Sequence, residues 1–359
     1  MSWRDQLLKR FDTATPVTPE PLALLDLTLW HQWHRARKTL PAGAGSTLPD
    51  ACRFLRTPVW APLRPWQAQY HDVQVDVEQT EEQRTIRYRT GKGQLEARWT
   101  LGPDGDWWQT DYLVKSAEDL PIAAEVVRDL SYVVDAAALE AARAEVGEDG
   151  MVPLELPMQP YSELLHRFLG WGAGLLLLHG EGSAYVGEIL AALDAKMRTL
   201  ASHLANLAGE VMFAPDNLDG QYISPRAFRD HLAPSYAAIA AAAQDRGKRL
   251  VVHIGGPSRR LVPLLAQAGV HGLQGIAGPP QGDITMADAR QEAGPEVVLW
   301  GGVPQDLLLE EHDRDAFEAS VALALEGARA DPRFLIGVAD RVPPEADVER
   351  LRALIRMAA

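Results

Sequence analysis

Short apolar runs recur along the chain from about residue 150 onward, and segments with a helical pattern separate them. The runs have the length of strands and cover residues 152–156, 210–214, 249–254, 272–276, 297–300 and 334–338. The other segments carry apolar side chains at i, i+3 and i+4, which is typical of amphipathic helices; they cover residues 161–178, 188–207, 225–246, 259–268, 285–292, 315–329 and 346–357. Apolar strands that alternate with helices predict a parallel sheet covered by helices.

The number of these strand and helix units favours a closed barrel. Six units within about 200 residues suit a (β/α)8 TIM barrel. An open, doubly wound sheet is the alternative, but its dinucleotide-binding version needs Gly-x-Gly-x-x-Gly between a strand and a helix, and the sequence has none. We therefore predict an α/β fold built as a (β/α)8 TIM barrel.

The first third of the chain has a different pattern. Residues 73–101 alternate apolar and polar side chains with period two, and Gly91-Lys92-Gly93 supplies a tight turn, so we expect an antiparallel β-hairpin. Ser116 then caps the start of a helix. We expect a single barrel domain over residues 1–359, with a helical and β-hairpin elaboration in 1–115 and the barrel core in 116–359.

Charge and composition exclude several classes of function. The chain has 49 acidic and 35 basic residues and a net charge of −14, which disfavours nucleic acid and anionic lipid as partners. Its longest apolar stretch, residues 171–178, is far shorter than the roughly 20 residues that cross a bilayer. The first residues lack the apolar core of a signal peptide. We therefore expect a cytoplasmic protein without a membrane partner.

Polar residues end or follow several of the predicted strands, where barrel enzymes carry their catalytic groups. They are Asp216, Asn217, His253, Gln274, Trp300 and Asp340, with Asp283 in a nearby loop. Each has a structural alternative, because an aspartate after a strand often caps a turn or helix and a buried histidine can bind a backbone carbonyl. Their occurrence at consecutive strand ends favours one shared pocket.

Four segments together resemble a known family. They are Asp216-Asn217 followed by Ile223-Ser224-Pro225, Gly247-Lys248 followed by Val252-His253, residues 280–283, and residues 337–344. In this order they resemble the uroporphyrinogen decarboxylase superfamily, over roughly residues 105–357. The superfamily also contains barrel methyltransferases that work with corrinoid proteins. True uroporphyrinogen decarboxylases have an arginine-rich Arg-Gln-Ala-Gly-Arg type motif, which is absent between Met1 and Pro65, so the chain is more similar to the corrinoid-dependent methyltransferase-like members.

Many methyltransferases of this superfamily bind zinc through His-x-Cys and a later cysteine, sometimes with a glutamate. The corresponding positions here are His253-Ile254-Gly255 and Asp340, with Gln274 where a glutamate can occur. Both thiolates are absent, and Cys52, the single cysteine of the chain, lies in the poorly matching N-terminal part, so a zinc–thiolate centre is doubtful. His253 and Asp340 could still bind a harder metal, or a zinc ion that also carries water.

The resemblance implies a methyltransferase that moves a methyl group from a small methylated compound, of methoxy or methylamine type, to a corrinoid. That cofactor would arrive on a partner protein, because this chain lacks an Asp-x-His-x-x-Gly motif of its own. We expect His253, Asp340 and Asp216 to be catalytic, and Asn217, Gln274, Trp300 and Asp283 to bind substrate.

Two alternatives stay open. One is a decarboxylase or lyase acting on a small carboxylic acid, in which His253 and Asp216 handle protons. The other is a non-catalytic binding protein that kept the barrel after losing the metal ligands.

Overall fold

The computed structural model describes residues 1–12, 18–103, 105–178, 180 and 182–358. Contacts divide the chain into two compact units. The first comprises residues 1–65, 136–156 and 204–359, and the second comprises residues 66–135 and 157–203. Residues 116–135 and 157–203, which we expected in the barrel core, thus pack within the second unit, and a single folding domain stays a prediction.

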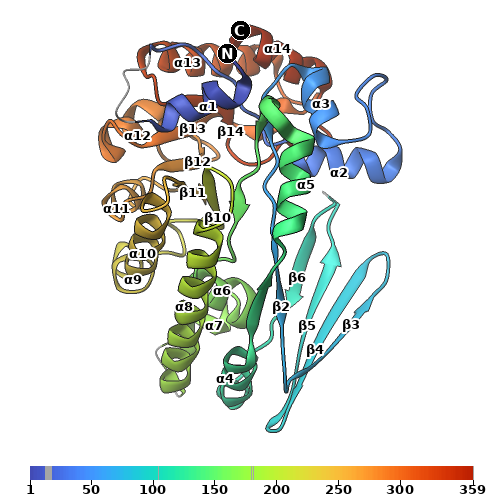
Figure 1. The fold of residues 1–359 in the computed structure, drawn as a ribbon, viewed down its shortest axis with the longest axis vertical. Coiled ribbons are helices and arrows are strands. Elements are labelled where there is room, and N and C mark those ends of the chain that lie inside the picture. Colours follow the sequence, from blue (N-terminus) through green and yellow to red (C-terminus); the bar gives the residue numbers. More distant parts are fainter. Residues whose placement is uncertain (13–17, 104, 179, 181, 359) are drawn as a thin grey trace. The chain divides into compact units, whose positions relative to one another are not determined.

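A parallel sheet forms the centre of the first unit (Figure 1). Its six strands lie side by side in sequence order, and every neighbouring pair is parallel. They are β9 (Leu154–Glu155), β10 (Val211–Leu218), β11 (Arg249–Ile254), β12 (Gly272–Ile276), β13 (Val298–Val303) and β14 (Phe334–Val338). The six strands correspond to the six apolar runs of the sequence.

Two further extended segments extend this sheet at its edges. Ala23 pairs in parallel with Ile336 beyond β14, and Leu63 pairs in parallel with Leu154 beyond β9. In the same region β1 (Val59–Trp60) pairs in parallel with β8 (Gly150–Met151). Thr57 lies just before β1, and its hydroxyl donates to the Ala23 carbonyl oxygen at 3.4 Å. The eight segments follow one another as in a (β/α)8 TIM barrel, and the predicted fold class is confirmed.

Helices connect the strands of this unit and pack on the sheet. α10 packs on β11, α12 on β13, and α13 on β13 and β14 (Figure 1). The helices are α1 (Trp3–Phe11), α2 (Thr28–Arg37), α3 (Leu48–Leu55), α5 (Ala136–Val146), α9 (Pro225–Ala227), α10 (Ala233–Gln244), α11 (Val262–Gln267), α12 (Met286–Ala293), α13 (Arg314–Ala330) and α14 (Val348–Ala358). The Ser224 hydroxyl accepts from the Ala227 amide at 3.1 Å and so caps α9, and Pro225 at the first helical position lacks only an N–H that would have no partner within the helix.

Packed side chains fill the interior at the amino-terminal half of the strands. Helix α1 contributes Leu7 and Phe11 to this cluster, which also contains Leu22, Leu24, Trp60, Met151, Val211, Phe213, Val251, Val298, Trp300 and Leu335. The Trp60 ring meets the Trp300 ring edge-on, with centroids 4.8 Å apart. At Gly272 an added Cβ would lie 3.2 Å from the Phe11 ring, so the missing side chain makes room for α1. Because these side chains fill the amino-terminal half of the interior, a functional site is expected at the carboxyl ends of the strands.

The second unit contains the predicted hairpin within a larger antiparallel sheet. Its order is β3 (Gln74–Gln79), β4 (Gln83–Thr90), β5 (Gly93–Leu101) and β6 (Trp107–Asp111). β2 (Trp66–Gln69) pairs antiparallel with β7 (Ser131–Val134). The helices are α4 (Leu120–Asp129), α6 (Pro160–Glu163), α7 (Ala173–Leu177) and α8 (Ser183–Ala205), with a π-helical stretch at Leu164–Leu169.

None of the helices formed by the described residues is both long enough and apolar enough to span a membrane.

The packing of α1 predicts a large effect of truncating its last side chain. Phe11→Ala should lower the free energy of unfolding by about 3–5 kcal/mol, because the ring is buried among the barrel residues. Urea denaturation measures this change. Phe54→Ala is the control, since that ring is partly exposed and lies under the Arg352 guanidinium at 4.6 Å. A loss in Phe11→Ala no greater than in Phe54→Ala would contradict the role of α1 in the core.

Candidate functional site

His253 lies near the carboxyl end of β11, and its imidazole ring has a partner on each side. Nδ1 lies 2.5 Å from Oε1 of Gln274, which occupies the adjacent position on β12. Nε2 lies 3.5 Å from Oδ1 of Asp340, which follows β14. An amide oxygen only accepts hydrogen bonds, so Nδ1 carries the hydrogen and donates it to Gln274. The ring therefore presents Nε2 to Asp340.

Gln274, His253 and Asp340 form a row, the His253 row, and burial differs along it. His253 is 8% exposed and Gln274 is 1% exposed, whereas the side chain of Asp340 is 39% exposed. The Asp340 carboxylate also accepts from the Arg341 amide at 2.7 Å, and the Arg341 guanidinium lies 3.9 Å away. The exposed end of the row is thus the carboxylate, and the imidazole behind it is held in one orientation.

Asp26 belongs to the same end of the barrel and was not predicted. It follows the segment that pairs with β14, and its carbonyl oxygen accepts from the Val342 amide at 2.8 Å. The buried carboxylate accepts from the Thr28 amide at 3.0 Å and from the Thr28 hydroxyl at 2.5 Å. Burial raises the pKa of Asp26, while Thr28 and the charge of Arg341 oppose the rise. The sequence does carry a signal for Asp26, because it is the one acidic residue inside the apolar stretch 22–27 and stands two positions before a threonine.

Asp216 is directed away from the His253 row. Its fully buried carboxylate accepts from the Tyr236 hydroxyl on α10 at 2.6 Å. Tyr236 belongs to α10, so the Asp216 carboxylate lies on the side of β10 that this helix covers. The structure therefore joins Asp216 to the packing of α10.

Asn217, the next residue, lies over the position of the missing thiolate. Its backbone has φ of 47°, and its Oδ1 occupies the space that a Cβ of residue 255 would need. A side chain at Gly255 would therefore require Asn217 to move. Cys52, the single cysteine of the chain, is fully buried, and burial raises the pKa of its thiol to about 12.

These residues do not fit the zinc centre that the resemblance implies. His253 and Asp340 face each other as two possible ligands, but Gly255 has no side chain and Cys52 is a buried thiol. Over the described ranges, no group of three or more His, Cys, Asp and Glu side chains is arranged to hold a metal ion.

Trp300 and Asp283 have structural partners. The Trp300 indole is 3% exposed and donates to the Leu24 carbonyl oxygen at 2.8 Å, so it belongs to the interior cluster. Asp283 accepts from the amides of Ser258 and Arg259 at 2.7 and 2.9 Å and thereby fixes the loop after β11. Of the seven residues predicted from strand ends and loops, the structure brings together His253, Gln274 and Asp340 in direct contact.

Comparison with known proteins supports the same family and fold. Residues 185–359 match the family model described as uroporphyrinogen decarboxylase (URO-D), which confirms the resemblance seen in the motifs. A solved methyltransferase from Methanosarcina mazei superposes with a TM-score of 0.62 at 15% identity, covering 100% of this chain and 98% of that chain. This likeness shows the fold.

Other similarities are weaker. A D-psicose 3-epimerase from Clostridium cellulolyticum H10, solved with D-tagatose, gives a TM-score of 0.37 at 12% identity, covering 67% of this chain and 84% of that chain. At this score it carries no argument about the present chain. No curated protein sequence matches the chain significantly.

The contact between Tyr236 and Asp216 predicts a loss of stability when the hydroxyl is removed. Tyr236→Phe should lower the free energy of unfolding by about 1–3 kcal/mol, because a buried carboxyl group loses a donor. Tyr185→Phe, at an exposed tyrosine, is the control and should change it by less than about 0.5 kcal/mol. Chemical denaturation of both variants is the measurement. An unchanged stability in Tyr236→Phe would show that this contact does not hold α10 on β10.

Proposed function

We propose that this chain transfers a methyl group from a small methoxy or methylamine compound to a corrinoid carried by a separate protein. The observation that carries the proposal is the orientation of His253, whose ring is held by Gln274 and whose Nε2 faces Asp340. All three residues lie within the part of the chain that matches the uroporphyrinogen decarboxylase family model. The fold shared with the Methanosarcina mazei methyltransferase supports the same class of reaction.

The bond changes define what the protein must do. The corrinoid, as co-substrate, supplies the electron pair for the new bond to the methyl carbon. The old carbon–oxygen or carbon–nitrogen bond breaks with its electron pair on the heteroatom, which leaves poorly as an anion. Protonated His253 donates the Nε2 hydrogen to that atom, so that a neutral alcohol or amine departs. A proton from solvent then restores the imidazolium, and atoms and charge balance.

The neighbours of His253 have distinct roles in this step. Gln274 is a positioning residue, because its amide oxygen binds Nδ1 and leaves Nε2 as the nitrogen that exchanges a proton. Asp340 lies 3.5 Å from Nε2 and helps to orient the ring, and its partly exposed carboxylate is placed beside an incoming substrate. The charges of both Asp340 and Arg341 act on the Asp26 carboxyl group: Asp340 raises its pKa and Arg341 lowers it.

A decarboxylase or lyase acting on a small carboxylic acid is the second candidate. The description of the matching family model favours it, and Arg341 beside Asp340 supplies a cation near the same imidazole. The two reactions differ in what His253 does, because decarboxylation leaves a carbanion to be protonated and releases carbon dioxide. Product analysis therefore separates them.

Removing the imidazole should slow the reaction strongly. His253→Ala is expected to lower the single-turnover rate of methyl transfer to cob(I)alamin by roughly 10²- to 10⁴-fold with little change in donor affinity, because the proton is needed mainly in the transition state. Asp340→Asn should lose less, since the amide keeps the shape and removes only the charge. Absorbance reports formation of methylcobalamin, with methoxy and methylamine donors supplied in turn.

His312→Ala provides the matched control, because that histidine is exposed on a loop before α13. It should retain the rate of the parent protein. Release of carbon dioxide from a small acid, with no methylation of cobalt by any donor, would replace the proposal with the decarboxylase alternative. Tight ligand binding without either reaction would leave the non-catalytic binding protein.

A further inference from the structure

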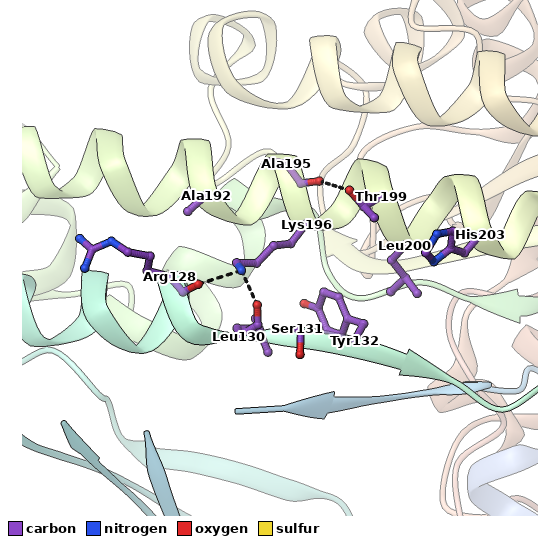
Figure 2. A pocket seen from close by; sticks show the side chains of 10 residues that line it. All are labelled: Arg128, Leu130, Ser131, Tyr132, Ala192, Ala195, Lys196, Thr199, Leu200 and His203. Carbon is purple, nitrogen blue, oxygen red and sulfur yellow. Dashed lines mark hydrogen bonds between the residues drawn. The ribbon is translucent and has the colours of Figure 1, made fainter. Parts of the chain in front are cut away.

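The second unit contains a cavity of about 420 Å³ that is separate from the His253 row. It lies between α8, the end of α4 and β7, and Figure 2 shows the ten described residues that line it. Small-molecule pockets typically measure about 300–1,000 Å³, so the volume suits a compact organic ligand. Nothing in the proposed methyl transfer uses this cavity.

One face of α8 forms a wall of the cavity. Ala192, Ala195, Lys196, Thr199 and His203 recur at the three- and four-residue spacing that aligns side chains on a helix. Leu130 and Tyr132 lie across from this face, and Leu200 of α8 faces Tyr132 (Figure 2). Leu130 and Leu200 are buried, whereas Thr199 and His203 are exposed. The cavity therefore has an apolar floor and a polar rim.

The charged groups of the cavity all have one sign. Arg128 and Lys196 line it, and none of the ten described lining residues is acidic, although the whole chain has a net charge of −14. Nearby acids have other partners. Asp129 accepts from three backbone amides, at residues 71–73, and Glu188 pairs with Arg128. Lys196 is thus the cation that faces the cavity without a carboxylate bound to it in the described contacts.

The Lys196 ammonium is held in place by backbone carbonyls. It donates to the Arg128 carbonyl at 3.0 Å and to the Leu130 carbonyl, as the dashed lines in Figure 2 show. An ammonium has three hydrogens, so one remains for a ligand. Burial lowers the pKa of Lys196, and the opposing charge of Asp129 offsets this only in part. An anion in the cavity would supply the missing counter-charge.

We infer that this cavity binds a small monocarboxylate with an apolar body. The carboxylate accepts the third hydrogen of Lys196, and the body packs on Leu130, Tyr132 and Leu200. A phosphate ester fits less well, because phosphate sites usually supply several backbone amides or unpaired guanidinium groups. Here the guanidinium of Arg128 is paired with Glu188.

Calorimetric titration of the full chain tests the inference with benzoate, 4-phenylbutyrate and octanoate as probes. At least one should bind saturably, and its neutral amide should bind at least ten-fold more weakly. Lys196→Met should remove this preference for the acid over the amide, because it keeps the alkyl length and loses the charge. Lys92→Met, in the exposed turn between β4 and β5, is the matched control and should bind as the parent does.

A second variant covers the case in which Lys196→Met unfolds the end of α4. Ala195→Trp places a large ring over the cavity from an exposed helix position and should reduce carboxylate affinity at least ten-fold while circular dichroism stays unchanged. Binding of acid and amide with equal affinity, full affinity in Ala195→Trp, or no binding of any of the three probes would overturn the inference.

Discussion

The hydrogen bond between His253 and Gln274 is the interaction on which the rest of the site depends. Parallel pairing of β11 with β12 sets these residues at the same level, and the amide oxygen then fixes which imidazole nitrogen carries hydrogen. Without it the ring could rotate or exchange tautomers, and Nε2 would no longer be directed at Asp340. The register between β11 and β12 thus determines which nitrogen of the His253 ring carries the hydrogen.

The two ends of the barrel differ, because packed side chains fill one end and the polar residues around His253 lie at the other. Helix α1 and the tryptophan pair Trp60 and Trp300 fill the interior at one end, where the Trp300 indole donates to the Leu24 carbonyl oxygen. At the carboxyl ends the row from Gln274 to Asp340 runs from buried to partly exposed. Gln274 and Asp340 hold the imidazole between them at this end.

Much of this arrangement could be predicted from the sequence, because six strands are short apolar runs that alternate with helices. The first two barrel segments were not predicted, since each is joined to the sheet by a single pair, at Ala23 and at Leu63. The contact among His253, Gln274 and Asp340 agrees with the expectation that polar residues in or after neighbouring strands share a pocket, and their roles stay a prediction. Asp216 met the same criterion, but the position of a strand end does not reveal which face a side chain occupies, and pairing along β10 is irregular beyond Ala214.

Nitrogen-15 NMR of the histidine side chains tests the central claim most directly, with His253→Gln used to assign the signal among the ten histidines. In the neutral ring of the parent protein, Nδ1 should carry the hydrogen and Nε2 should not, and Gln274→Leu should yield a mixture of the two tautomers. A neutral ring with its hydrogen on Nε2, unchanged in Gln274→Leu, would contradict the account.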